Sequence, residues 1–322
     1  MLPNFSYLRA RTLDEASGHA AAPGARLMAG GTDLLGCLRD EALAADQVVS
    51  LGGLADLKQV RERDGGLELG ALVTIAQVAA HPRIRQLYPV LAQAAAAVAS
   101  PQLRNQGTLG GNLCQKPRCW YWRGDFPCVR RGGAFCSAQD GQNQFHCILG
   151  GDVCIYVHPS DTAPALLALD ATVQVRGPRG GRTVPLADFH VKPEDDPTRE
   201  TVLAPGEIVT AVRVPAPPAG ARSAYRKVRS RGAWDFALAS TALVVAHEGG
   251  RVRRARVVLG GVAPVPWRAV AAEAELEGQK LTEATAARAA AAALADARPL
   301  AHNGAKVTIC RNVLAAELLK LV

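Results

Sequence analysis

The sequence predicts an α+β protein of two domains, of which the first is built in two parts and carries a cysteine-rich insertion. The length of 322 residues is enough for about two domains, each with its own apolar core. Strand-like runs alternate with helical stretches up to a proline-rich stop at 215–220, and β-rich runs followed by helices come after it. We therefore expect parts at 1–55 and 56–220, the insertion at 114–154, and a C-terminal domain of sheet plus helices at 221–322.

The first part is expected to be a small α/β unit. The apolar run RLMA (26–29), the pair Gly30-Gly31 and the following apolar run predict a strand, a glycine turn and a helix start. DQVVSLGGL (46–54) predicts a second short strand.

The second part begins with LELGALVTIAQVAAH (67–81), which predicts a strand leading into a helix capped near Thr74. VLAQAAAAVAS (90–100) predicts a buried alanine-rich helix, and TLGGNL (108–113) predicts a tight glycine turn. HPSDTAPALLALDATVQVRG (158–177) predicts a turn, a helix and a strand, and the next strands continue this sheet up to the proline-rich stop.

In the C-terminal domain, two β-rich runs joined by EGG (248–250) predict a hairpin. The alanine-rich stretch that follows and AKVTICRNVLAAELLKLV (305–322) predict helices that pack on this sheet.

Composition and charge exclude several classes of protein. The net charge of +8 is scattered, and its densest stretches, RKVRSR (226–231) and RVRRARV (251–257), lack interleaved aromatics and any nucleic-acid motif. The N-terminus has no signal-peptide pattern, and no run of about 18 apolar residues could span a membrane. We therefore expect a reducing compartment, where cysteines favour metal or redox chemistry over a disulfide framework.

Two diglycine segments could hold an anion. Glycine lets the backbone approach a phosphate closely and present successive N–H groups to it, and a helix start adds a favourable dipole. AGGTDLL (29–35) and TLGGNL could together clamp a pyrophosphate, although each could also be a tight connection. Neither fits G-x-G-x-x-G, and the chain has no P-loop pattern, so this is neither a usual Rossmann site nor a P-loop site.

Six of the eight cysteines lie between residues 114 and 154. Four of them have the spacing C-x8-C-x7-C-x17-C and could enclose a [4Fe-4S] cluster, namely Cys119, Cys128, Cys136 and Cys154. A zinc site usually pairs its ligands as C-x2-C, which is absent here, but the spacing does not exclude zinc or a disulfide set. Cys37 and Cys310 are expected to be buried small residues, and Cys114 and Cys147 have no assigned role.

The motifs in this order resemble the FAD-binding medium subunit of the molybdenum hydroxylases. The resemblance covers essentially the whole chain and rests on AGGTDLL, QLRNQGTLGGNL, HPSDTAPALLALDA, LAPGEIVTAVRVP, YRKVRSRGAWDFALAS and VVLGGVAPVPWRA. It implies a two-part FAD-binding domain of the vanillyl-alcohol-oxidase type, followed by the C-terminal flavoprotein domain. The cysteine-rich insertion is similar to that of the 4-hydroxybenzoyl-CoA reductase and periplasmic-type aldehyde oxidoreductase flavoprotein subunits, and RCWYWR and CIYVHPSD look closer to the latter.

The resemblance implies roles for particular residues. The FAD pyrophosphate would lie on the first diglycine segment, which comprises Leu27, Met28, Ala29, Gly30, Gly31, Thr32, Asp33 and Leu34. The clamp would be completed by Thr108, Gly111 and Asn112. Asp161 would face the ribityl or ring region of FAD, with Ile208 and Lys227 near the isoalloxazine, and the [4Fe-4S] cluster would be held by the four cysteines named above.

The implied function is that of an electron-transfer subunit in a heterotrimeric complex, inactive on substrate alone. Electrons would pass from a large molybdenum-cofactor subunit and a small [2Fe-2S] subunit through FAD to an external acceptor. Aldehyde oxidation is the expected reaction, although a 4-hydroxybenzoyl-CoA reductase or xanthine dehydrogenase flavoprotein subunit would share these motifs. The residues themselves are also compatible with a stand-alone flavin reductase, and with a non-catalytic interaction subunit whose loop is braced by zinc. The expected location is the cytoplasm, or the periplasm through export with a signal-bearing partner.

Overall fold

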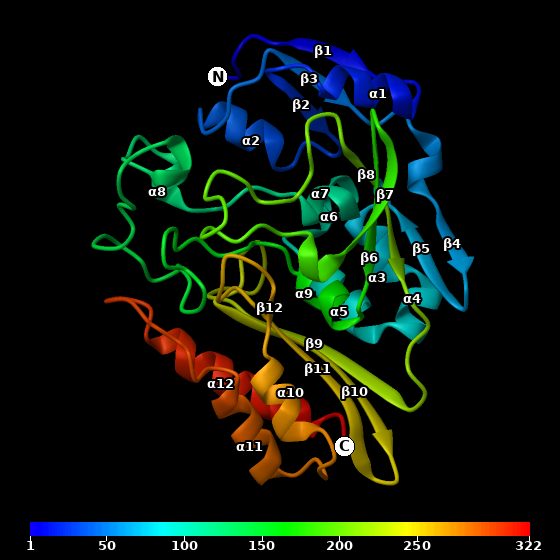
Figure 1. Cartoon of the computed structure of the whole chain (residues 1–322), viewed down its shortest axis with the longest axis vertical. Coiled ribbons are helices and arrows are strands. Elements are labelled where there is room, and N and C mark those ends of the chain that lie inside the picture. The colour runs from blue at the N-terminus through cyan, green and yellow to red at the C-terminus, as the bar shows by residue number, and fades with distance from the viewer.

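The computed structural model describes all 322 residues and contains three β-sheets with helices packed between and around them (Figure 1). The sheets lie within residues 6–50, 60–214 and 221–268, and the boundaries expected near residues 55 and 220 fall between them. None of the helices has the length and the apolar character that crossing a membrane would require.

The first sheet has three parallel strands in the order β1-β3-β2. The two strands predicted at 26–29 and 46–54 are β2 and β3, and β1 was not predicted. Its elements are β1 (Ser6–Arg9), α1 (Leu13–Ala20), β2 (Ala25–Met28), α2 (Leu34–Arg39) and β3 (Gln47–Ser50). The glycine turn expected at Gly30-Gly31 connects β2 to α2, so this segment leaves the sheet at the carboxyl end of a strand. The 3-10 helix η1 (Ala55–Lys58) leads to the next sheet.

The second sheet is antiparallel, with five strands in the order β4-β5-β8-β6-β7. Its strands are β4 (Val60–Arg63), β5 (Gly66–Gly70), β6 (Thr172–Gly177), β7 (Gly180–Pro185) and β8 (Ile208–Val214), with η3 (Leu186–Asp188) after β7. Between β5 and β6 run α3 (Ile75–Ala80), α4 (Pro82–Leu87), α5 (Pro89–Ala97), α6 (Pro101–Gln106), α7 (Leu109–Leu113), α8 (Trp120–Arg123), η2 (Val129–Arg131) and α9 (Thr162–Ala168). The cap expected at Thr74 is a complete capping box with Gln77, and the alanine-rich helix α5 is buried as predicted.

The third sheet is antiparallel in the order β12-β11-β10-β9, and its β10–β11 hairpin turns at Gly249-Gly250 as predicted. Its strands are β9 (Ala221–Val228), β10 (Ala239–Glu248), β11 (Arg251–Gly260) and β12 (Trp267–Arg268), followed by α10 (Val270–Leu276), α11 (Glu283–Ala292) and α12 (Ala305–Leu319). Successive side chains of a strand point to opposite faces of its sheet. In β10, Leu243 therefore packs in the core with α10 to α12, and Val244 packs in the core with α5 and α9.

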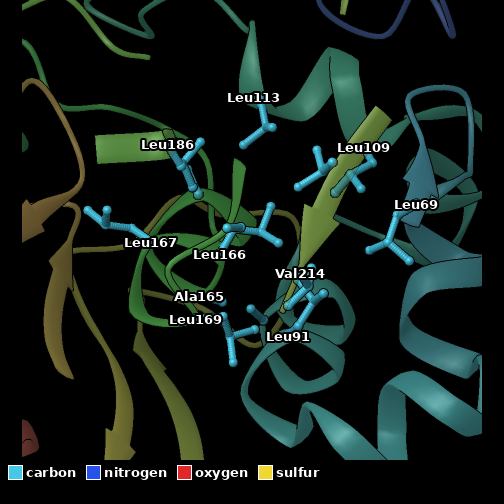
Figure 2. Close-up of a cluster of buried hydrophobic side chains, with 14 of the residues drawn as sticks. Leu69, Leu91, Leu109, Leu113, Ala165, Leu166, Leu167, Leu169, Leu186 and Val214 are labelled. Atoms are coloured by element: carbon cyan, nitrogen blue, oxygen red, sulfur yellow. The ribbon is translucent and has the colours of Figure 1, made fainter. Parts of the chain in front are cut away.

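The largest core therefore lies between the second and third sheets, around α5, α7 and α9. Figure 2 shows part of it, where Leu91 of α5, Leu109 of α7 and Leu166 of α9 lie with Val214 of β8. This core fixes the position of α7, which carries the second diglycine pair, relative to α9, which follows Asp161. Cores of this kind are close-packed with few voids, so α7 and α9 can shift little relative to each other.

The cysteine-rich segment (114–154) has little regular structure and connects the domains. Cys128 and Trp122 pack against Cys37 of α2, whereas Ile148 packs in the core of the C-terminal domain. Asn303, just before α12, donates to the carbonyl oxygen of Cys147 at 3.0 Å. The segment therefore spans from the first sheet to the last helix.

Candidate functional site

A cavity of about 410 Å³ lies where the two diglycine segments meet. This volume is within the range of small-molecule and cofactor sites. Thirteen of the fourteen residues that the sequence analysis named for FAD line it, namely Leu27, Met28, Ala29, Gly30, Gly31, Thr32, Asp33, Leu34, Thr108, Gly111, Asn112, Asp161 and Lys227. Segments up to 200 residues apart in the chain thus converge on one cavity.

Gly30 and Gly31 of the first diglycine segment must be glycine for two different reasons. At Gly30, a Cβ would overlap the backbone carbonyl of Gln106, so only glycine lets this loop lie against the chain that leads to the second segment. Gly31 has φ +73, a left-handed conformation that glycine adopts without strain. The two segments therefore touch through backbone rather than through side chains.

The expectation of a tight turn at TLGGNL was wrong. Gly110 and Gly111 lie inside the short helix α7, and neither has a positive φ. Thr108 is the N-cap, and its Oγ1 accepts the N–H of Gly111 at 3.2 Å. A Cβ at Gly110 would come within 2.9 Å of the Cβ of Ala71, so close packing rather than turn geometry requires glycine there.

Replacing Thr108 by alanine should lower the free energy of unfolding by about 1 kcal/mol, because the helix loses its N-cap acceptor. Serine at the same position keeps the hydroxyl and should stay close to wild type. Denaturant unfolding of the three proteins measures this difference. An equal loss for both variants would show that the threonine methyl group, rather than the cap, stabilises the helix.

Asn112 joins α7 to the start of α9. Its Oδ1 accepts hydrogen bonds from Ser160 Oγ at 2.5 Å and from Thr162 Oγ1 at 2.6 Å. Ser160 and Thr162 are both buried, so these bonds hold the PSD segment against the second diglycine segment. Since Oδ1 is occupied, the amide nitrogen is the group that Asn112 can offer to a ligand in the cavity.

A buried ion pair lies in the wall of the cavity. Lys227 Nζ is 2.7 Å from Asp161 Oδ2, and Tyr225 donates its hydroxyl to Asp161 Oδ1 at 2.7 Å. The side chains of Lys227 and Asp161 are only 3% and 6% exposed. Burial raises the pKa of the Asp161 carboxyl, and the neighbouring Lys227 and Tyr225 oppose this shift. The positive charge of Lys227 is therefore compensated inside the protein.

Ile208 is the one residue named for FAD that does not line the cavity. It begins β8 and is buried in a small core that includes Leu51 and Leu72, with Leu27 and Ala29 packed against it. Ile208 therefore lies behind the first diglycine segment and supports it.

Several cavity residues were not assigned a role from the sequence. Lys116 and Arg118 line the cavity from the start of the cysteine-rich segment, and Trp234 and Phe236 line it from the loop between β9 and β10. The first stretch lies within the cysteine-rich insertion, and the second lies within the quoted motif YRKVRSRGAWDFALAS, but nothing local in either stretch indicates that it reaches the first sheet. Only the long-range packing of the folded chain brings these two stretches to the first sheet.

The four cysteines of the expected cluster are neighbours in the fold. The side chains of Cys136 and Cys154 interact, which lowers the pKa of Cys136 to about 6 and raises the pKa of Cys154. Burial raises the pKa of Cys119 to about 11, and the charges of Cys136 and Cys128 act on Cys119 in the same direction. Cys37 and Cys310, expected to be buried, are 0% and 1% exposed.

Backbone N–H groups near three of these sulfurs act to lower the pKa of the thiols. Those of Trp122 and Tyr121 act on Cys119 in this way. Those of Ala138 and Ile155 act on Cys136, and that of Tyr156 acts on Cys154. The positive charge of Arg130 also acts on Cys154. N–H donors and positive charge around sulfur are the environment that stabilises thiolates.

No group of three or more His, Cys, Asp or Glu side chains is arranged to hold a single metal ion. A tetrahedral zinc site would need four sulfurs about 3.8 Å from one another, given Zn–S bonds of about 2.3 Å. A [4Fe-4S] cluster binds each thiolate to a separate iron and needs them spread more widely. His146 Nε2 lies 3.3 Å from Cys119 Sγ.

Comparisons with known proteins cover the whole chain. Residues 3–217 match the family model described as the FAD binding domain in molybdopterin dehydrogenase, and residues 223–321 match the CO dehydrogenase flavoprotein C-terminal domain. The aldehyde oxidoreductase FAD-binding subunit PaoB of Escherichia coli K12 is 41% identical over 98% of this chain and 97% of its own length. The carbon monoxide dehydrogenase medium chain of Hydrogenophaga pseudoflava is 28% identical over 92% of this chain and 88% of its own.

The fold agrees with these sequence matches. The structure of a carbon monoxide dehydrogenase from Hydrogenophaga pseudoflava superposes with a TM-score of 0.78 at 27% identity, covering 98% of this chain and 96% of the other. Quinoline 2-oxidoreductase from Pseudomonas putida 86 superposes with the same TM-score at 26% identity, over 100% and 98% of the two chains.

Proposed function

This chain belongs to the FAD-binding medium subunits of the molybdenum hydroxylases, and from that membership we propose that it is the FAD- and [4Fe-4S]-containing electron-transfer subunit of an aldehyde-oxidising complex. Its partners would be a large molybdenum-cofactor subunit and a small [2Fe-2S] subunit. The aldehyde substrate is proposed because the E. coli aldehyde oxidoreductase subunit is similar over nearly its whole length. The large subunit would oxidise the aldehyde, and this chain would transfer the electrons through FAD to an external acceptor.

The cavity suits FAD because backbone forms much of its wall. We propose that the first diglycine segment and α7 hold the pyrophosphate between them, with Asn112 offering its amide nitrogen. The N–H of Gly111 is already bonded to Thr108, so the donors are expected mainly from the first segment. Lys116 and Arg118 line the same wall, with Lys116 paired to Glu200 and Arg118 paired to Asp33. FAD, when bound, can accept electrons in pairs and release them singly.

The Asp161–Lys227 pair would position the flavin rather than act as a free cation. Both residues line the cavity, and Tyr225 and the carbonyl oxygen of Ala97 hold the pair in place at 2.7 Å and 3.3 Å. A compensated pair presents an oriented dipole to a ligand, with the ammonium available as a donor. We therefore expect Lys227 to favour reduced flavin less strongly than an unpaired lysine would.

We propose that Cys119, Cys128, Cys136 and Cys154 hold a [4Fe-4S] cluster. The backbone N–H groups near Cys119, Cys136 and Cys154 fit metal-bound thiolates, because they stabilise the charge on sulfur. The cysteine spacing alone left zinc and disulfides open. These N–H groups favour metal-bound thiolates over disulfides, and the family resemblance implies [4Fe-4S] rather than zinc. A cluster of this kind takes up and releases single electrons.

The observation that carries the proposal is the direct continuity of the two sites. Lys116 and Arg118 line the flavin cavity, and the next residue, Cys119, is a proposed cluster ligand. Consecutive Cα atoms are about 3.8 Å apart, so the ligand begins one residue from the cavity wall. This closeness favours exchange of electrons between the two cofactors.

Aldehyde addition to the purified complex tests the proposal. We expect the visible flavin absorbance to bleach when aldehyde is added anaerobically to the complex, and to stay unchanged when the same aldehyde is added to this chain alone. Dithionite should bleach both samples, which controls for an inaccessible flavin. Oxidation of aldehyde by the isolated chain, or turnover of the complex with the flavin left oxidised throughout, would contradict the proposal.

A further inference from the structure

The side chain of Asp33 connects the first diglycine segment to the cysteine-rich segment. Its Oδ2 accepts the backbone N–H of Lys116 at 2.6 Å. Its Oδ1 lies 2.7 Å from Arg118 Nη1 and 2.9 Å from Arg123 Nη2. The Asp33 side chain is only 17% exposed, so these contacts are partly shielded from water. One carboxylate at the start of α2 therefore holds three residues of the cysteine-rich segment.

The charges explain why this contact matters for an anionic ligand. Asp33 lines the cavity beside Gly31 and Thr32, where a lone carboxylate would repel a pyrophosphate. The guanidinium of Arg118, which lines the same cavity, and that of Arg123, which Asp40 shares at 3.4 Å, compensate this negative charge. The cysteine-rich segment thus neutralises the carboxylate of Asp33 in this wall, and it does so only when it lies against Asp33.

Packing ties the same contact to the proposed cluster ligands. Cys128 and Trp122 are buried against Cys37, which lies one turn beyond Asp33 in α2, and Cys119 packs against this group. The guanidinium of Arg123 lies 5.6 Å from the centre of the Trp122 ring, as in a cation–π contact. Arg123 therefore contacts Asp33 and also Trp122, which lies between the proposed ligands Cys119 and Cys128 in the sequence.

We propose that Asp33 is a positioning residue that couples the two cofactor sites, so that FAD in the cavity and an ordered cysteine-rich segment stabilise each other. This coupling rests on the proposed function, because it takes FAD as the occupant of the cavity. Coupling of this kind is reciprocal: a segment that raises the affinity for FAD must itself be ordered by FAD to the same degree. The ligands Cys119 and Cys128 are then held in place for their cluster when the cavity is filled.

Hydrogen exchange on the full chain, stripped of FAD and then given it back, tests the coupling. In the wild type, FAD should slow exchange of the amides of residues 119–136 by about fivefold or more, the usual size of such coupling. Arg123→Gln removes the contact from a residue that does not line the cavity. It should nevertheless weaken FAD binding about fivefold and reduce the protection of 119–136 to less than about twofold. Asp33→Asn removes the charge from the other side and should likewise reduce the FAD-induced protection of 119–136 to less than about twofold.

Asp40→Asn is the matched control. Asp40 pairs with the same Arg123 at 3.4 Å, but it is 36% exposed and does not line the cavity, so both FAD affinity and FAD-induced protection should remain as in the wild type. Full protection by FAD in Arg123→Gln and Asp33→Asn, or FAD binding to the wild type without protection of 119–136, would overturn the coupling. Failure of the wild type to bind FAD at all would instead overturn the proposed function, and iron analysis reports on the cluster separately.

Discussion

Methionine in place of Lys227 is expected to lower the free energy of unfolding by about 3–5 kcal/mol, because it leaves the Asp161 carboxylate buried without its partner. Both side chains are almost fully buried, so water cannot replace the lost ammonium. Denaturant unfolding of the full chain measures the loss. The flavin should also become harder to reduce, because the ammonium no longer faces it, and a redox titration with reference dyes measures this shift.

The double variant Asp161→Asn with Lys227→Met separates the ion pair from simple packing. It removes both charges, and we expect it to recover most of the stability that the single variant loses. Methionine in place of Arg288, which pairs with Glu275 at 3.0 Å on the surface, should cost no more than about 1 kcal/mol. An equal loss in the single and double variants of the buried pair would contradict this account.

Alanine in place of Gly30 is expected to abolish retention of FAD. The new Cβ would overlap the backbone carbonyl of Gln106, and neither backbone can yield without moving the two diglycine segments apart. The FAD content of the purified variant, measured per chain against the wild type, reports the effect. Thermal unfolding of the same samples shows whether the rest of the chain still folds.

Gly36→Ala is the control for this substitution. Gly36 lies within α2, and a Cβ there would meet only Arg123 Nη1 at 3.7 Å, an ordinary contact. Alanine also favours a helix over glycine by about 1 kcal/mol, so this variant should keep its FAD and gain slightly in stability. A folded Gly30→Ala protein with as much FAD as Gly36→Ala would show that the approach of the two segments is not needed for binding.

Sequence patterns predicted those caps and turns that depend only on residues close together in the chain. The strand, glycine turn and helix around Gly31 were predicted, as were the cap at Thr74 and the hairpin at Gly249-Gly250, because each depends on neighbours in sequence. The diglycine of α7 was wrongly predicted as a turn. Its glycines are required by packing against Ala71, nearly 40 residues away, and no local pattern reveals such a contact.

The resemblance to the family identified the residues of the cavity but not their interactions. It assigned Asp161 and Lys227 to the flavin separately, whereas the structure pairs them at 2.7 Å. It assigned Asp33 to the pyrophosphate, whereas the structure directs the Asp33 carboxylate at Arg118 and Arg123. These partners lie 66, 85 and 90 residues apart in the chain, so they depend on tertiary packing that composition and spacing do not encode. The roles of these residues toward FAD stay predictions.

The cysteines show the same limit in another form. Their spacing favoured a cluster but could not separate ligands from bystanders. The fold adds backbone N–H groups near Cys119, Cys136 and Cys154 that act to lower the pKa of each thiol. Cys147 lies nearby and is buried, and burial raises its pKa to about 12. The pKa of Cys119 and that of Cys154 are raised as well, so this shift does not separate Cys147 from the proposed ligands.

Cofactor analysis of the purified chain tests the central claim most directly. FAD, iron, acid-labile sulfide and zinc are measured per chain on anaerobically prepared protein, with Cys136→Ser alongside as a variant that lacks one proposed ligand. We predict about one FAD with about four iron and four sulfide in the wild type, and loss of iron and sulfide in the variant. One zinc per chain with no flavin, or iron that stays unchanged in Cys136→Ser, would contradict the account.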